Sequence, residues 1–300
     1  MPFPEAFGVG TIRRFTLSSS LFVVTYQCTL TRDIQFRRPA RPDHDHQPII
    51  TFSFRNVVRA GLTETMPDQT LHPPAYQPPS VQVSSSDFAL DLFFPARSQV
   101  NTIIIGIHVT LLNQLMGQQG QTPLIRRLLE AHHPYLYEEI SSLAVQQIAT
   151  ELITQHTTSP LPTFYLTIKV QELIYQFFLE LLKRETKAVY PLRDQEVKTL
   201  FRVRDQLVMQ LNQVPSIPHL ARLAGMSESK LRRLFGQVFG MSLYAYYQTV
   251  RMHEAARLLR ETRLSVSETG YQLGFTNLSH FTRVFEQHLG QKPRHYAKSN

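Results

Sequence analysis

The fold is decided by residues 217–246, IPHLARLAGMSESKLRRLFGQVFGMSLYAY, and residues 266–296, VSETGYQLGFTNLSHFTRVFEQHLGQKPRHY, which are two versions of one segment. Gly225 matches Gly274 at an offset of 49 residues, and five later positions match at an offset of 50, so the second copy has a turn one residue longer. These five pairs are Leu231 with Phe281, Arg233 with Arg283, Phe235 with Phe285, Gly240 with Gly290, and Tyr246 with Tyr296. A repeat at a fixed offset predicts one supersecondary element used twice.

Each copy predicts a short helix, a turn and a longer helix. Gly225 and Gly274 suit the left-handed backbone at the end of the short helix, because glycine has no Cβ to clash there. Polar residues that can accept the first amides of a helix stand at the expected helix starts: Ser216, Ser227, Asn277, and Ser265 with Glu268 as a capping box. This order is typical of the helix-turn-helix, and we expect two of them, at about residues 216–240 and 265–290.

The longer helix of each copy has an apolar and a polar face. Helical spacing predicts that the apolar residues of each helix point to the core: Leu231, Leu234, Phe235 and Val238 in the first copy, and Phe281, Val284, Phe285 and Leu289 in the second. The polar side carries Ser229, Lys230, Arg232 and Arg233 in the first copy, and Ser279, His280, Thr282 and Arg283 in the second. Such side chains can reach base edges or phosphates, and arginine against guanine is the commonest specific contact. A merely solvated face is the alternative, and two copies in the same frame favour DNA.

Between the two copies, residues 244–262, YAYYQTVRMHEAARLLRET, predict one continuous helix capped by Ser242. About 18 residues at 1.5 Å each span roughly 27 Å. A rigid helix of that length can hold two longer helices about one DNA turn apart, in successive major grooves of one duplex.

These stretches resemble the AraC/XylS family of transcription regulators. The resemblance is carried by LARLAGMSESKLRRLF at 220–235, RMHEAARLL at 251–259 and residues 265–296, and it covers about a third of the chain. It implies that two sets of side chains enter successive major grooves of double-stranded DNA: Ser229, Lys230, Arg232 and Arg233, then Leu278, Ser279, His280, Thr282 and Arg283. One departure is Gly270, where the family more often has alanine, and glycine costs roughly 0.5–1 kcal/mol of helix stability. The C-terminal motif is also similar to that of the siderophore-responsive branch.

The positive charge of the chain gathers in its last third. Residues 194–300 hold 15 lysines and arginines against 8 aspartates and glutamates, whereas residues 1–193 hold 16 against 15. A local basic excess is the electrostatic footprint of a polyanion partner, although a solvated basic surface stays open on charge alone. Because the longer helix of the first copy has three cations and that of the second has only Arg283, we expect the first copy to supply most of the affinity.

The chain before these copies predicts a β-rich domain followed by helices. Apolar residues alternate in four short stretches broken by turns and prolines, which favours a sandwich or barrel: Phe22 to Leu30, Ile50 to Phe54, Phe88 to Leu92, and Ile103 to Ile107. From about Val109 the spacing becomes helical. Members of the family often have an N-terminal cupin-like barrel that binds an effector and dimerises. The expected fold class is therefore α+β: an effector-binding and dimerisation domain at 1–190, cupin-like and β-rich to about 108, then an all-α DNA-binding domain at 191–300.

Residues 161–185, LPTFYLTIKVQELIYQFFLELLKRE, predict a helix whose apolar face is wider than one stripe. Val170, Leu173, Ile174 and Phe177 recur at helical spacing, and Phe178 widens the face. One side is expected to pack on the strands. The other side points either to a homodimer partner through the helix around 164–185 or to a helix buried wholly within its own chain.

The N-terminal domain offers no specific ligand motif. His44, Asp45 and His46 invite a metal site, because imidazole is a common ligand, but no third ligand follows at a recognisable spacing, so a polar loop is the preferred interpretation. Arg37, Arg38 and Arg41 form a basic cluster that either holds an anionic effector or another partner or belongs to a solvated loop. The aromatic residues that could line a ligand cavity or simply form core are Phe22, Tyr26, Phe52 and Phe54.

The remaining functional classes are weakly supported. There is no GxxxxGK[ST], HExxH or GxSxG motif, and Cys28 has strand periodicity, so we expect neither an enzyme nor a cofactor. The alternatives to a regulator are a DNA-binding architectural protein without an effector and, with no residue to support it, an enzyme with a fused DNA-binding domain. One cysteine and no spanning or secretory segment predict a cytoplasmic protein. Activation and repression both stay open, and an activator would have RNA polymerase as a further partner.

Overall fold

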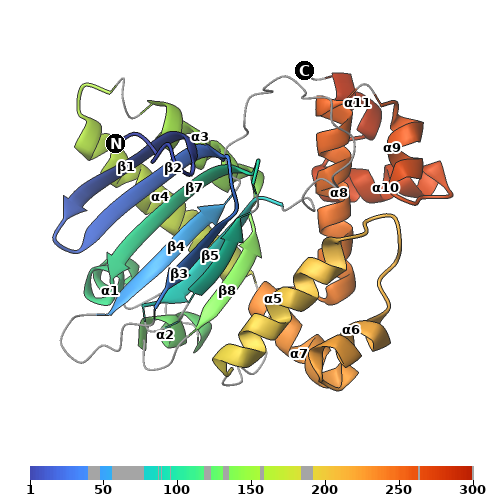
Figure 1. Ribbon diagram of the computed structural model, residues 1–300, viewed down its shortest axis with the longest axis horizontal. Helices are drawn as coiled ribbons and strands as arrows, with labels where there is room; N and C mark the ends of the chain where they lie inside the picture. Colours follow the sequence, from blue (N-terminus) through green and yellow to red (C-terminus); the bar gives the residue numbers. More distant parts are fainter. Residues whose placement is uncertain are drawn as a thin grey trace. The chain divides into compact units, whose positions relative to one another are not determined.

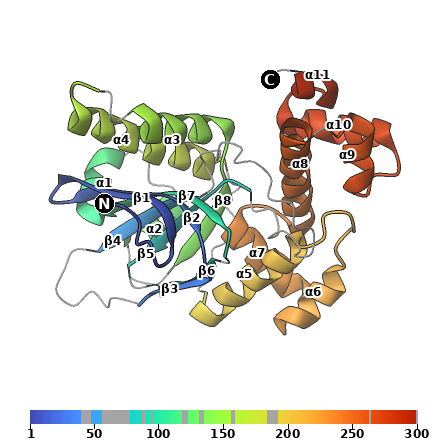
Figure 2. The ribbon, with the colours of Figure 1, turned by 45° about the horizontal axis from the view of Figure 1, so that its top comes forward.

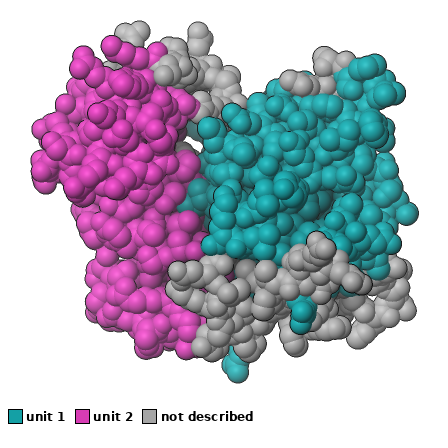
Figure 3. Space-filling view, turned by 180° about the vertical axis from the view of Figure 1, so that it is seen from behind, with its two compact units in different colours: residues 1–61, 79–194 teal, residues 62–78, 195–300 magenta. Residues whose placement is uncertain are grey.

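Two units with separate cores make up the part of the chain that the structure describes (Figure 3). The structure is a computed structural model, and it describes residues 1–39, 48–55, 78–86, 88, 90–94, 96–117, 123–130, 135–155, 159–183, 192–262 and 264–298. The described residues before Gln195, Pro78 aside, form unit 1, and those from Gln195 onward belong to unit 2.

Unit 1 is built on an antiparallel sheet with the strand order β1-β2-β7-β4-β5-β8 (Figure 1). In that order the strands are Gly8–Ser18, Leu21–Leu30, Gln99–His108, Ile49–Arg55, Ser80–Ser85 and Leu136–Ile140. A separate two-stranded sheet pairs β3, Ile34–Arg38, with β6, Leu90–Phe94. The expected β-rich region is therefore present, as a sheet with antiparallel neighbours.

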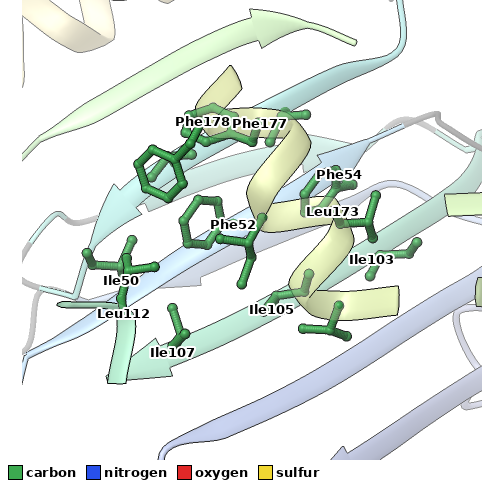
Figure 4. Close-up of a cluster of buried hydrophobic side chains, with 14 of the residues drawn as sticks. Ile50, Phe52, Phe54, Ile103, Ile105, Ile107, Leu112, Leu173, Phe177 and Phe178 are labelled. Atoms are coloured by element: carbon green, nitrogen blue, oxygen red, sulfur yellow. The ribbon is translucent and has the colours of Figure 1, made fainter. Parts of the chain in front are cut away.

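Helices α3 and α4 lie over one face of this sheet (Figure 2). The helices of unit 1 are α1, Val109–Met116; α2, Pro123–Glu130; α3, Leu143–Gln155; and α4, Pro162–Leu182. Their apolar sides meet alternate residues of the central strands, and Phe52 stands at 5.4 Å and 6.0 Å, between ring centroids, from Phe177 and Phe178 of α4 (Figure 4). Burial of these rings makes the sheet and α4 one core.

Two sequence expectations for unit 1 are wrong in detail. Residues from about Val109 onward were expected to be helical, but Leu136–Ile140 forms β8 at the edge of the sheet, between α2 and α3. In β2 the alternation is also shifted, because Leu21 and Val23 are buried under the helices while Phe22, Val24 and Tyr26 are only partly buried on the opposite face. The run LFVV is apolar on both faces, so alternation alone could not choose between them.

Helices and no strands form the secondary structure of unit 2 in its described residues from 195 onward. Its helices are α5, Asp194–Val208; α6, Ile217–Ala224; α7, Glu228–Phe239; α8, Leu243–Glu261; α9, Val266–Gln272; α10, Leu278–Leu289; and α11, Pro293–Lys298. Helix α8 is the longest of them and contacts α7, α9, α10 and α11. Each of the two repeated copies of the sequence is thus a short helix and a longer one, joined to the other copy by α8.

In the part of the chain that the structure describes, no helix combines the length and the apolar character needed to cross a membrane.

Candidate nucleic-acid interface

The first helix-turn-helix consists of α6, a turn at Gly225 and α7. Gly225 adopts the left-handed conformation, with a φ of 61°, and Ser216 accepts a hydrogen bond from the amide of His219. Ser227 starts α7 by accepting the amide of Lys230 at 3.3 Å. The helix boundaries expected from these caps are confirmed.

The second helix-turn-helix, α9 and α10, repeats this construction. Ser265 and Glu268 form the expected capping box, with the Ser265 amide donating to the Glu268 carboxylate at 2.7 Å, and Asn277 caps α10 through the amide of His280. Gly274 has a φ of 77°, and a Cβ there would lie 2.1 Å from the carbonyl oxygen of Asn212. Glycine is therefore required at this turn both for its backbone conformation and for its contact with the segment before α6.

The polar faces of α7 and α10 are accessible, as their spacing predicts. The inward side chains of both helices are buried apart from Leu289, which is partly buried. Of the predicted DNA contacts, the exposed ones are Ser229, Arg232, Arg233, Ser279, His280 and Arg283, and the partly buried ones are Lys230, Leu278 and Thr282. The two copies thus present the same type of polar surface at equivalent positions.

Leu278 is partly withdrawn because it packs toward α9. A Cβ on Gly270 would lie 2.8 Å from a terminal methyl of Leu278 and 3.2 Å from the ring of Phe281. The glycine that departs from the family pattern therefore lets the first turn of α10 approach α9 closely, which compensates in packing for a weaker helix.

Lys230 and Arg232 of α7 have carboxylate partners. The Lys230 ammonium lies 2.8 Å from the carboxylate of Glu196 on α5, and Arg232 lies 3.3 Å from Glu228, one turn earlier on α7. For Arg283 of α10, no ion pair is found among the described residues. A count of cations therefore overstates the advantage of the first copy, because each paired cation must exchange its carboxylate for a phosphate.

Helix α8 is fixed to the second copy by a buried arginine. Arg251 is 5% exposed, and its guanidinium lies over the ring of Phe275 at 3.6 Å from the ring centroid and donates from Nε at 2.8 Å and from Nη2 to the carbonyl oxygen of Leu273. On the preceding turn of α8, the hydroxyl of Tyr247 donates to the carbonyl oxygen of Leu211 at 2.8 Å. The bonds of Arg251 hold α8 to the turn of the second copy, and the bond of Tyr247 holds it to the segment before the first.

His253, also on α8, carries no charge at neutral pH. Burial, together with the neighbouring His288, lowers the pKa of His253 to about 4. His253 is therefore neutral at pH 7 and adds nothing to the positive potential of unit 2.

Sequence analysis missed Glu196 and Arg251. Glu196 lies on α5, outside the repeat, so no local pattern connects it to α7. Arg251 could have been found, because it occupies the apolar stripe of α8 between Tyr247 and Ala255, which are both fully buried. An arginine in such a stripe needs an internal acceptor.

The aromatic residues and arginines of unit 1 that were candidates for ligand binding do not lie together at one site. Phe52 and Phe54 are core beneath the helices, whereas Phe22 and Tyr26 lie on the opposite face. Arg37 is exposed, and Arg38 turns onto the sheet, where it donates to Thr51 and Ser84 side chains and to two backbone carbonyls.

Three of these predictions concern metal, anion or thiol chemistry. Arg41 and the candidate metal ligands His44, Asp45 and His46 lie outside the described residues, within which no cluster of three metal-ligating side chains occurs. Burial raises the pKa of the Cys28 thiol, which fits the expectation of a core residue.

Residues 220–299 match a family model described as a helix-turn-helix domain. The probable transcription factor PqrA of Proteus vulgaris is 30% identical over 91 residues, which are 30% of this chain and 75% of PqrA. The chain belongs to the AraC family of helix-turn-helix transcription regulators. The regulatory protein PchR of Pseudomonas aeruginosa is 29% identical over 185 residues, 61% of either chain, so this AraC-family chain spans less than two thirds of PchR.

Among solved structures, the DNA-binding domain of AdpA in complex with a target DNA is 27% identical, with a TM-score of 0.32 over 34% of this chain and 91% of that domain. The named relatives of this AraC-family chain are transcription regulators and not enzymes.

Replacing Arg251 by methionine is expected to loosen the second helix-turn-helix. The Leu273 carbonyl would lose its buried donor, which costs about 1–3 kcal/mol. Hydrogen exchange should show faster opening at Gly274 and Phe275, and urea unfolding should show the lost stability. The matched control is Arg257→Met on the same helix, whose partners Glu254 and Glu261 are nearer the surface, and which should cost under about 1 kcal/mol. Equal losses in both variants would contradict the assigned role of Arg251.

Proposed function

We propose that the chain regulates transcription by inserting α7 and α10 into successive major grooves of one DNA duplex, in response to a small molecule bound by unit 1. The observation that carries the proposal is the pair of exposed polar helices joined by α8. Its 19 residues extend for about 28 Å, comparable with the roughly 34 Å between successive turns of DNA. Residues 191–300 are the proposed DNA-binding domain. Activation would in addition need a contact with RNA polymerase.

The proposed DNA contacts divide by chemistry. Arg233 and Arg283 occupy equivalent positions of the two copies, are both exposed, and are the residue type that reads guanine in the major groove. Phosphate and further base contacts are assigned to Ser229, Lys230, Arg232, Leu278, Ser279, His280 and Thr282.

Arg233→Ala and Arg283→Ala should each weaken binding to an operator selected from a random DNA library. Loss of a bidentate base contact costs about 1–3 kcal/mol, or roughly 5- to 150-fold, and binding to scrambled DNA should fall much less. Fluorescence anisotropy at several salt concentrations measures both. Arg257→Ala removes the same charge from α8 and serves as the control. Equal losses on operator and scrambled DNA would reduce the arginines to phosphate contacts.

Support for an effector comes from the sheet face opposite α3 and α4. Beside apolar side chains such as Leu136, this face carries buried Gln82, Ser84 and Glu138, which are 3%, 4% and 2% exposed, and the guanidinium of Arg38 reaches it from β3. Gln82 donates to the Glu138 carboxylate at 2.7 Å.

Burying such groups costs free energy, so a polar interior is uncommon unless function requires it. We propose that residues 1–190 are a cupin-like effector-binding domain that uses this face to bind a small molecule through hydrogen bonds and charge.

The effector proposal predicts a thermal shift. A panel of sugars, sugar acids, hydroxy acids and ferric siderophores should contain compounds that raise the melting temperature, since binding to the folded state stabilises it. Glu138→Gln should abolish that shift. Glu139→Gln, on the same strand with its side chain directed to the other face, should retain it. No shift with any compound of this panel would favour a DNA-binding architectural protein, and equal loss in both variants would remove this face from the proposal.

Helix α4 has a second apolar side that its own chain does not cover. Leu161 at its cap and Phe164, Ile168, Tyr175 and Leu182 along it are between 44% and 65% exposed, so the helix is not buried wholly within its own chain. Their spacings of 3, 4, 7 and 7 residues match the seam of a two-stranded coiled coil. A second copy of this chain fits that seam, because an isologous pair places the same stripe on both partners. We therefore propose a homodimer through α4.

Ile168→Glu should convert the dimer to a monomer in sedimentation experiments, because it places a charge in the centre of the seam. Leu115→Glu, at a similarly exposed position on α1, should leave the mass unchanged. A wild-type chain that stays monomeric at micromolar concentrations would exclude this interface.

A further inference from the structure

The first turn of α5 places a carboxylate on α7. Glu196 and Lys230 form an ion pair of 2.8 Å, with side chains that are 20% and 43% exposed. Helix α5 is held in this position by its apolar side, because Val197 and Leu200 are buried and the ring centroids of Phe201 and of Phe239 in α7 are 5.1 Å apart. The carboxylate therefore stands at a fixed place beside α7.

This pair differs from the other ion pair on α7. Glu228 belongs to α7 itself, one turn from Arg232, so it moves with the helix. Glu196 belongs to a separate helix that directly follows the connection from unit 1 along the chain. Lys230 is thus a proposed DNA contact whose ion pair joins α7 to another helix.

We propose that Glu196 competes with the DNA backbone for the Lys230 ammonium and so sets how strongly the first helix-turn-helix binds phosphate. The inference rests on the proposed DNA-binding function. Because both side chains are partly exposed, the pair is weak enough for a phosphate to displace the carboxylate. The first turn of α5 then decides how much of the charge of Lys230 is offered to DNA.

The competition has a signature in the salt dependence of binding. A free lysine that meets a phosphate releases a cation condensed on the DNA, and each such contact contributes about 0.9 to the slope of log affinity against log salt. When Lys230 leaves Glu196, the carboxylate that it had neutralised attracts a cation in return, so much of that release is cancelled. Removing the carboxylate should restore the full release.

The experiment measures the affinity of the full chain for scrambled duplex DNA and for the selected operator across a range of potassium chloride concentrations. Glu196→Gln is expected to bind about threefold or more tighter at low salt, with a slope steeper by up to about 0.9. Lys230→Gln should change the slope little, and in the double variant the effect of Glu196→Gln should disappear. Glu261→Gln is the control, because it removes the same charge and an ion pair with Arg257 from the same unit.

The outcomes separate the two proposals. If wild-type protein binds no DNA, the proposed function fails. If the wild-type protein binds DNA and Arg233→Ala weakens that binding, the proposed function stands. The competition is then refuted by either of two results: Glu196→Gln has the same effect as Glu261→Gln, or Glu196→Gln keeps its effect when Lys230→Gln is also present. Melting temperatures of each variant verify folding, and Glu196→Ala, expected to act in the same direction, replaces Glu196→Gln if that variant is unstable.

Discussion

The arrangement of unit 2 depends on the buried contact between the Arg251 guanidinium and the carbonyl oxygen of Leu273. A charged residue that is 5% exposed is tolerated only because its donors meet that oxygen and Gln248, and because its flat surface lies on Phe275. The contact ties the middle of α8 to the turn that starts α10. Since Tyr247, one turn earlier on the same side of α8, is bonded to Leu211, one helix contacts both the turn of the second copy and the segment before the first.

Much of unit 2 could be predicted from sequence because its signals are local. Three signals each determine structure within one or two helical turns: a glycine at a helix end, a serine or asparagine three residues before its amide partner, and an apolar stripe. All of them recur in the second copy. The contacts that could not be predicted join residues far apart in sequence. The residues around Glu196 in the sequence do not predict its ion pair with Lys230. Those around Gly274 do not predict that its turn packs against Asn212.

Unit 1 was less predictable, for two physical reasons. Both faces of its sheet are partly covered, so an apolar run such as the start of β2 does not identify its inner side. In β8, Glu138 and Glu139 favour a helix by propensity, but pairing with β5 decides the outcome and buries Glu138 beside Gln82. Arg38 likewise comes from a stretch that looks like a solvated loop, and only the tertiary structure brings it onto the sheet.

The stiffness of α8 also constrains any DNA on which both copies act together. A continuous helix bonded at two points along its length cannot stretch or swivel to follow a change in the distance between half-sites. One additional base pair would turn one half-site by about 34° around the duplex axis relative to the other, given 10–10.5 base pairs per turn. The nucleic acid would then have to twist or bend to compensate, so the recognisable sites in a genome would share a single spacing even where their bases differ.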